Sequence, residues 1–157
     1  QRGAERCLHV GGPGRLGAVL HERGHHVVGV DADPVLIEAA RADHPGPTWL
    51  VADLAELDLP AMGEPEPFAA AVLAGNVMVF VAPGTETDVL RQVAGHVVAD
   101  GPIVVGFHTN RELSLARFDE CVAEAALELE HRFATWDLRR WHEGADFAVS
   151  VLRRPAG

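Results

Sequence analysis

A glycine-rich turn between two apolar segments constrains this chain more than any other part of its sequence. Residues 6–31 read RCLHVGGPGRLGAVLHERGHHVVGVD. The apolar runs at both ends suit parallel strands buried on two faces, and the residues between the turn and the second run have helical spacing. The segment therefore predicts a strand, a turn, a helix and a second strand, which is half of a nucleotide-binding βαβ unit.

The turn itself predicts a ligand. Gly11, Gly12 and Gly14 come where the first strand passes into the helix. Without side chains, such a turn lets backbone N–H groups and the positive end of a helix approach a ligand. Asp31 ends the second strand, beside the crevice in which a carboxylate can hold the ribose hydroxyls of an adenosine. We therefore expect an adenosine-containing ligand there.

Two families of domain fit this turn. Gly12, Gly14 and Gly17 spell GxGxxG with Asp31 about 20 residues later, so the stretch resembles NAD-binding domains, including the small modules that gate potassium transport. It also resembles motif I of class I S-adenosylmethionine-dependent methyltransferases, which is an acid, one apolar residue and GCGxG. Against that motif the chain is one residue short and has His9 in place of the acid. The turn alone slightly favours NAD.

Composition excludes several classes of function. With 157 residues and 48% apolar content, the chain is expected to form one domain, residues 1–157, without the second domain that a dehydrogenase normally needs. A net charge of −10 argues against nucleic-acid partners, because Lys and Arg supply most of the affinity for phosphates. Lysine and tyrosine are absent, which excludes a Walker A loop, a Schiff base and the Tyr and Lys pair of short-chain dehydrogenases. A small-molecule substrate remains.

The sequence also predicts a cytoplasmic protein without a membrane partner. No apolar run approaches the roughly 18–20 residues of a membrane span, and no signal segment opens the chain. Cys7 and Cys121 are expected to be reduced thiols. The nine histidines lack the spacing of metal ligands, so we expect no metal site. The sequence leaves room for a homodimer.

Apolar periodicity predicts the elements that follow Asp31. A helix begins at Pro34 with Asp33 as its N-cap. Residues 58–67, DLPAMGEPEP, predict a surface loop. The remaining elements expected before the C-terminal third are strands at 48–52, 68–73 and 103–107 and a helix at 85–98.

The last third of the chain separates the two families. After a helix at 115–126, residues 127–138 and 146–154 alternate apolar and polar side chains, and RRWHEGA joins them, which predicts an antiparallel hairpin. A sheet of parallel strands that ends in such a hairpin is typical of class I methyltransferases, whereas NAD domains end in a parallel strand. The tail also resembles small bacterial members of that family, whose pattern is close to "aGL.lehR..tWD..pw..gdfaVsvlRr". The resemblance runs from Arg6 onward.

The resemblance implies an α/β fold. It is a doubly wound, Rossmann-like three-layer sandwich whose seven-stranded sheet has the order 3-2-1-4-5-7-6 with strand 7 antiparallel. It also implies S-adenosylmethionine as cofactor, with Asp53 on the adenine amine and residues 74–76 beside the methionine part. Asp53 and Asn76 could instead cap local turns. The cofactor-binding residues implied are Val10, Gly11, Gly12, Gly14, Asp31, Ala32, Asp53, Leu54, Ala74, Gly75 and Asn76.

Methyl transfer is an in-line displacement in which positioning of the acceptor supplies most of the catalysis. His108, at the end of the fifth strand, is the candidate base for an acceptor that arrives protonated. Arg111, Trp136 and Trp141 are candidates for the substrate pocket, together with His108, although ordinary packing also accounts for the tryptophans.

The shortened turn and His9 predict weak S-adenosylmethionine binding and turnover that is weak or lost. The chain also begins almost at its first strand, whereas family members usually carry an N-terminal helical segment that covers the cofactor and shapes the substrate pocket. Much of what determines substrate specificity is therefore expected to be missing or to lie elsewhere. The alternative function is a non-catalytic regulatory module that binds NAD or another adenine nucleotide through GxGxxG and Asp31. The sequence does not name the methyl acceptor or its acceptor atom.

Overall fold

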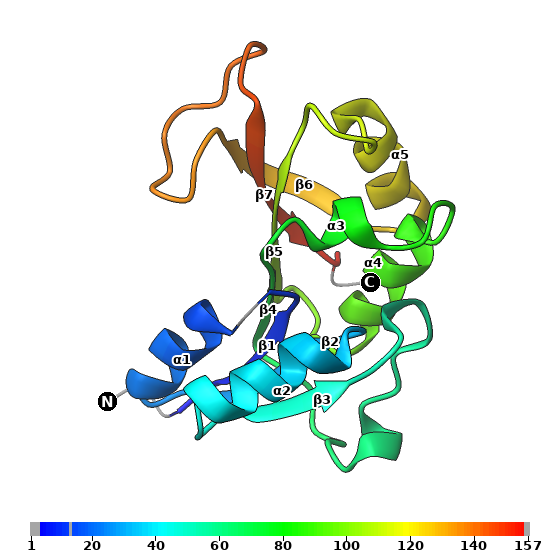
Figure 1. The fold of residues 1–157 in the computed structure, drawn as a ribbon. Coiled ribbons are helices and arrows are strands. Elements are labelled where there is room, and N and C mark those ends of the chain that lie inside the picture. The colour runs from blue at the N-terminus through cyan, green and yellow to red at the C-terminus, as the bar shows by residue number, and fades with distance from the viewer. Residues whose placement is uncertain (1–3, 13, 156–157) are drawn as a thin grey trace.

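The computed structural model describes residues 4–12 and 14–155. Seven strands form one sheet in the order β3-β2-β1-β4-β5-β7-β6 (Figure 1). The first five are parallel, and β7 runs antiparallel to both β5 and β6. The predicted strand order and the antiparallel strand 7 are confirmed. The strands are β1 (Arg6–Val10), β2 (His26–Asp31), β3 (Thr48–Val51), β4 (Ala70–Leu73), β5 (Pro102–His108), β6 (Glu128–Phe133) and β7 (Phe147–Arg153).

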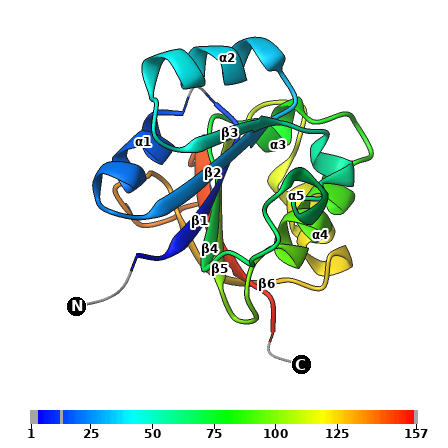
Figure 2. The same ribbon diagram turned by 90° about the horizontal axis from the view of Figure 1, so that it is seen from below.

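Helices cover both faces of the sheet, as Figure 2 shows. One side carries α1 (Arg15–Glu22) and α2 (Pro34–Asp43). The other side carries α3 (Val77–Phe80), α4 (Glu86–Gly95) and α5 (Leu115–Glu124). Two short 3₁₀ helices, η1 (Leu54–Glu56) and η2 (Pro60–Met62), follow β3. This is the three-layer, doubly wound arrangement that the sequence predicts.

Local sequence explains how α2 begins. Asp33 accepts a hydrogen bond from the N–H of Val35 (2.9 Å), and Pro34 occupies the first helical turn, where its missing N–H costs nothing. The expected N-cap is therefore confirmed. The main core lies between the sheet and α4 and α5, where Phe107 of β5 meets Phe118 of α5 at 4.9 Å between ring centroids.

Several element boundaries differ from the sequence-based expectations. The strand expected at 68–73 begins at Ala70, because Phe68 instead forms an isolated bridge with Val97, beyond the end of α4. Helix α3, Val77–Phe80, has no counterpart among the elements that the sequence predicts. Helices α4 and α5 both end two or three residues earlier than expected, and α5 is followed by Ala126 in a left-handed conformation (φ 59°).

The C-terminal hairpin is shorter in its strands and longer in its connection than expected. Strand β6 ends at Phe133 and β7 starts at Phe147, so residues 134–146 connect them instead of RRWHEGA alone. Phe133 forms a bridge with Arg140, which folds the connection back on itself. Trp136 leaves the strand and packs over Gly106 of β5, where a side-chain methyl group would overlap the indole. Non-local packing therefore overrides the alternating pattern there.

None of the helices among the described residues has the length and apolar character of a membrane span. In the same residues, His, Cys, Asp and Glu side chains form no group of three or more placed to ligate a metal ion. Cys7 and Cys121 are buried and are not paired in a disulfide.

Candidate functional site

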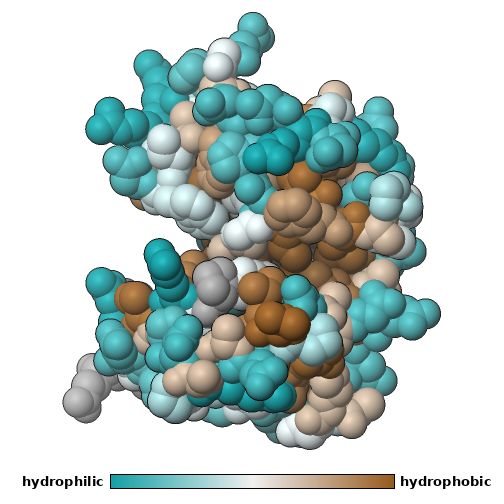
Figure 3. All heavy atoms as spheres, in the orientation of Figure 1, coloured by the Kyte–Doolittle hydropathy of each residue, from teal (hydrophilic) through white to brown (hydrophobic). Residues whose placement is uncertain are grey.

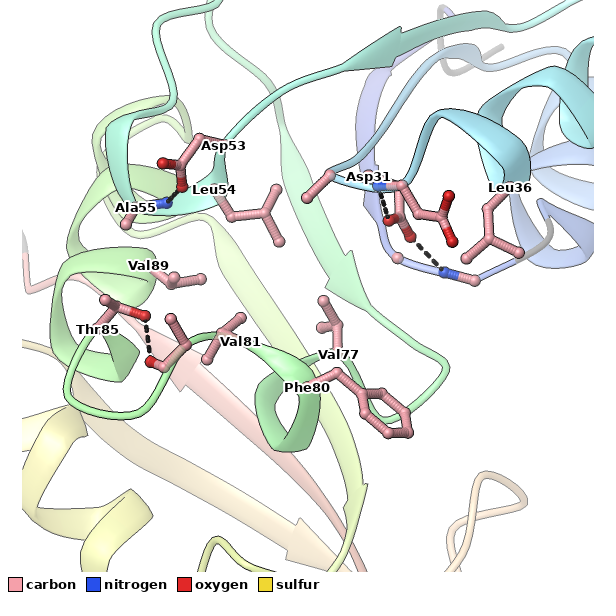
Figure 4. A pocket seen from close by; sticks show the side chains of 15 residues that line it. Asp31, Leu36, Asp53, Leu54, Ala55, Val77, Phe80, Val81, Thr85 and Val89 are labelled. Carbon is pink, nitrogen blue, oxygen red and sulfur yellow. Dashed lines mark hydrogen bonds between the residues drawn. The ribbon is translucent and has the colours of Figure 1, made fainter.

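A cavity of about 560 Å³ opens where β1, β2, β3 and β4 end (Figure 4). Its walls come from the glycine turn, the start of α2, the η1 helix, α3 and the start of α4. The carboxyl ends of parallel strands are where open α/β sheets bind ligands. The lining residues are Gly11, Gly12, Asp31, Ala32, Asp33, Leu36, Asp53, Leu54, Ala55, Val77, Phe80, Val81, Ala82, Thr85 and Val89.

Asp31 is held in place by backbone donors on two sides. The N–H of Gly12 donates to its Oδ2 (3.2 Å), and the N–H of Asp33 donates to its Oδ1 (2.8 Å). A carboxylate oxygen can accept more than one hydrogen bond, so both oxygens of Asp31 can still accept hydrogen bonds from ligand hydroxyls. The contact with Gly12 ties the end of β2 to the glycine turn, so Asp31 both lines the cavity and anchors the turn.

Asp53 begins η1 and lies on the other side of the cavity from Asp31 in Figure 4. Its Oδ1 accepts a hydrogen bond from the N–H of Ala55 (3.0 Å). The capping role that the sequence leaves open as an alternative for Asp53 is therefore present. A carboxylate has two oxygens, so a capping role at Oδ1 leaves Oδ2 as an acceptor for a ligand amine.

The interior of the cavity is apolar. Leu54, Val77, Val81 and Val89 point into the space between the two aspartates in Figure 4. Phe80 of α3 lines the same cavity and is 72% exposed. Among the described residues that line the cavity, the charged ones are three aspartates and none is basic. The site therefore suits a flat apolar group with hydroxyl and amine donors, and it disfavours a polyphosphate.

Two turns meet at the floor of this region. Gly11 has a φ of 82°, and a methyl group on it would lie 2.8 Å from Cβ of Val77 and 2.9 Å from the carbonyl oxygen of Ala74. A methyl group on Gly75 would lie 3.2 Å from Cα of Gly12. The glycine turn and the turn after β4 therefore pack directly on each other, which only residues without side chains allow.

The structure brings some of the predicted cofactor residues to the cavity and leaves others behind it. Gly11, Gly12, Asp31, Ala32, Asp53 and Leu54 line the cavity. Val10 is buried within β1, Ala74 and Gly75 support the glycine turn, and Gly14 lies against the ring of Trp49. These four residues and Asn76 are not among the lining residues.

Asn76 contacts His108. Its Oδ1 accepts the backbone N–H of His108 (2.7 Å), and its Nδ2 lies 2.8 Å from Nδ1 of the imidazole. Oδ1, which can accept a second hydrogen bond, also lies 3.0 Å from Nδ1, but the Nδ2 contact is the shorter of the two. Donation from Nδ2 to Nδ1 leaves the proton of a neutral ring on Nε2. Asn76 occupies the N-cap position of α3, but its side chain makes no capping hydrogen bond there.

The predicted substrate-pocket residues lie around β5 and the hairpin, away from the lining of the cavity. The ring of His108 packs edge-on against Phe147 (4.8 Å between centroids), which also neighbours Trp136 (6.4 Å). Trp141 lies 5.8 Å from the guanidinium of Arg132. Arg111 is exposed in the turn after β5. Figure 3 shows the surface hollowed between the part of the molecule that carries α1 and the part that carries the 134–146 connection.

His9 lies in the core. Its ring is 3% exposed and meets Trp49 edge-on at 6.0 Å between centroids. Burial lowers the pKa of His9 to about 4, because a charged imidazolium loses its hydration there. The ring is not among the groups that line the cavity. The side chain at this position of β1 therefore offers a ligand no anionic acceptor.

Sequence reasoning missed part of the cavity wall. Leu36 and Val89 belong to helices that the sequence predicts, but periodicity gives the apolar face of a helix and not what lies over its end. Val77 and Phe80 were missed because α3 is one turn long, too short for a periodic signal. Asp33 was recognised only as an N-cap.

Comparisons with known proteins show the family to which the chain is similar. A family model described as a methyltransferase domain matches residues 8–101. A solved TehB-like S-adenosylmethionine-dependent methyltransferase from Corynebacterium glutamicum is 35% identical, with a TM-score of 0.89 over 98% of this chain and 82% of that chain. No curated protein sequence matches the chain.

Two more distant structures share the fold. A methyltransferase from Streptomyces caelestis, CcbJ, is 20% identical, with a TM-score of 0.83 over 96% of this chain and 89% of that one. An amino pentose methyltransferase from Micromonospora echinaspora, solved with S-adenosylmethionine bound, is 16% identical, with a TM-score of 0.72 over 94% of this chain and 83% of that one.

Proposed function

This chain belongs to the methyltransferase domain family, and from that premise we propose that it binds S-adenosylmethionine in the cavity and methylates a small-molecule acceptor. The observation that carries the proposal is the pair of aspartates around an apolar interior. Asp31 would accept hydrogen bonds from the ribose hydroxyls, and Oδ2 of Asp53 would accept one from the adenine amine. The packed turns at Gly12 and Gly75 would face the methionine part of the cofactor.

Two observations favour this cofactor over NAD. The described lining residues include three carboxylates and no basic side chain, so the pyrophosphate of NAD would face repulsion. Gly14 and Gly17, the second and third glycines of GxGxxG, pack against the ring of Trp49, which gives the dinucleotide-like spacing a structural reason of its own. The GxGxxG pattern therefore gives little support for NAD.

Methyl transfer requires little of the protein beyond positioning the acceptor against the methyl group. The sulfonium of the cofactor supplies an electrophilic methyl group. We assign His108 to the acceptor side, where Asn76 orients the imidazole. With its proton on Nε2, the ring can orient an acceptor by donating a hydrogen bond, and it would need the other tautomer to act as a base. Arg111, Trp136 and Trp141 remain our candidates for contacts to the acceptor.

We also propose that the cofactor binds more weakly here than in a family member with an intact motif I. An acid at position 9 would offer an anionic acceptor to the cofactor's ammonium group, whereas His9 is neutral and faces Trp49. The turn is also one residue shorter, which changes where its N–H groups point.

Calorimetric titration with S-adenosylhomocysteine and, separately, with NADH tests the proposal. We expect S-adenosylhomocysteine to bind to one site per chain and NADH to give no binding heat at the same concentrations. Binding of NADH alone would overturn the methyltransferase assignment in favour of a nucleotide-binding regulatory module.

The tautomer of His108 can be tested without knowing the acceptor. In Asn76→Asp, both side-chain oxygens can only accept, so the imidazole proton should move from Nε2 to Nδ1. The ring ¹⁵N chemical shifts of His108, measured where the ring is neutral, distinguish the two tautomers. Asn110→Asp, exposed two residues further along, is the matched control and should keep the wild-type tautomer. A wild-type ring that already carries its proton on Nδ1 would contradict the assignment.

A further inference from the structure

The ring of Trp49 lies against three glycines, two at the start of α1 and one in β2. A methyl group on Gly14, at the start of α1, or on Gly17, within α1, would lie 2.8 Å from Cη2 of the indole. A methyl group on Gly29, the partner of Trp49 in the β2–β3 register, would overlap the ring. The indole therefore crosses over β2 and reaches the glycine turn and α1. Each of these positions must lack a side chain for the ring to fit.

Several contacts fix the ring in this position. The indole N–H donates to the carbonyl oxygen of His44 (2.9 Å), beyond the end of α2. Ile37 and Ala40 of α2 form a separate buried cluster with it. His9 closes the other end of the ring, and Trp49 is only 4% exposed. The indole is thus held by α2, β1 and β2 together, and has little freedom to move.

The ring gives the glycine turn its third point of support. The N–H of Gly11 donates to the carbonyl oxygen of Val30 (2.9 Å), and the N–H of Gly12 donates to Asp31. Gly14, at the far end of the turn, has a φ of 89° and rests on the indole. Gly11 and Gly12 line the cavity, whereas Gly14 and Trp49 do not, so the indole supports a part of the turn that lies outside the cavity lining.

We propose that Trp49 is a positioning residue for the cofactor: it sets the height and direction of the glycine turn by filling the space behind Gly14 and Gly17. The inference rests on the proposed function. It adds that a residue of the edge strand β3, which does not line the cavity, determines how well the turn meets the methionine end of the ligand. A misplacement on the order of 1 Å in a positioned reactant can cost about 100-fold in rate, so the support of such a turn matters for function.

A pair of variants separates positioning from simple stability. Trp49→Leu should weaken S-adenosylhomocysteine binding about tenfold by calorimetry, because leucine is too short to reach Gly14. It should also lower the unfolding midpoint, because a cavity remains. Adding Gly29→Ala fills part of that cavity beside β2, so the double variant should regain midpoint but not affinity. Recovery of both quantities, or an unchanged affinity in Trp49→Leu, would reduce Trp49 to ordinary core packing.

A measurement on the unaltered protein guards against variants that fail to fold. The chain has three tryptophans, so ¹⁵N-tryptophan labelling gives three indole signals. Trp136→Phe and Trp141→Phe, at exposed and half-buried positions, identify two of them and leave the signal of Trp49. We expect that signal to shift as S-adenosylhomocysteine saturates the wild-type protein. A Trp49 signal that stays in place at saturation overturns the inference alone. Absence of any S-adenosylhomocysteine binding to the wild type overturns the proposed function and the inference with it.

Discussion

Replacing Asp31 by alanine is expected to weaken S-adenosylhomocysteine binding by about 1–3 kcal/mol, or roughly 5- to 150-fold in Kd. The substitution would remove the charge-assisted hydrogen bonds from the ribose hydroxyls to the carboxylate. It would also remove the acceptor to which the N–H groups of Gly12 and Asp33 donate in the free protein. Both effects act in the same direction, because the first removes a ligand contact and the second loosens the glycine turn.

Calorimetry on two further variants shows which effect dominates. Asp31→Asn keeps one oxygen acceptor but removes the charge, so its affinity should fall between those of the wild type and Asp31→Ala. Asp58→Ala is the matched control. Asp58 is an exposed aspartate that also accepts a backbone N–H, that of Ala61, but it does not line the cavity. If Asp31→Ala binds as tightly as Asp58→Ala, the crevice at the end of β2 is not the ligand site.

Acid is expected to destabilise the protein through His9. The folded-state pKa of His9 is about 4, below the ordinary value of 6.5, so between these values the unfolded chain binds the proton and the folded chain does not. Stability contributed by the neutral ring is therefore complete above pH 6.5 and falls as pH decreases toward 4. Linkage gives a loss of about 2 kcal/mol at pH 5 and about 3 kcal/mol below pH 4.

Urea unfolding at pH 7.5 and pH 5.0 tests this expectation. His9→Gln has no titrating group at that position, so its loss of unfolding free energy between the two pH values should be about 2 kcal/mol smaller than that of the wild type. His142→Gln replaces an exposed histidine of the hairpin connection and should keep the wild-type pH dependence. Equal acid sensitivity of the wild type and His9→Gln would mean that His9 is not buried as a neutral ring.

Much of the fold follows from local sequence. The parallel strands, α1, α2 and the N-cap at Asp33 were predictable, because helical spacing, apolar runs and capping residues express themselves within a few residues. The antiparallel hairpin followed from alternation. The positions at which distant contacts override those patterns could not be predicted. Phe68 pairs with Val97, and Trp136 lies outside the strand that the alternation predicts and packs on Gly106.

The candidate site divides in the same way. Asp31, Asp53 and the turn at Gly11 and Gly12 were accessible from the sequence, because a strand's end and the glycines after it are local features whose place in a parallel sheet is fixed. The walls of the cavity were not, because Phe80 comes from a helix of one turn and Val89 from the start of another. Their meeting depends on how α3 and α4 pack over the sheet.

The residues alone predict the direction of the strands and the edge of the sheet at which the cavity opens, and the family resemblance predicts the strand order. What individual residues do at that edge depends on how distant parts of the chain pack together. His9 belongs to the core with Trp49, and Asn76 binds His108, 32 residues away. Gly14 and Gly17 pack against an indole from β3 although their spacing suggests a dinucleotide. A glycine in a sequence shows that a side chain is absent, and only the folded chain shows which group occupies that space.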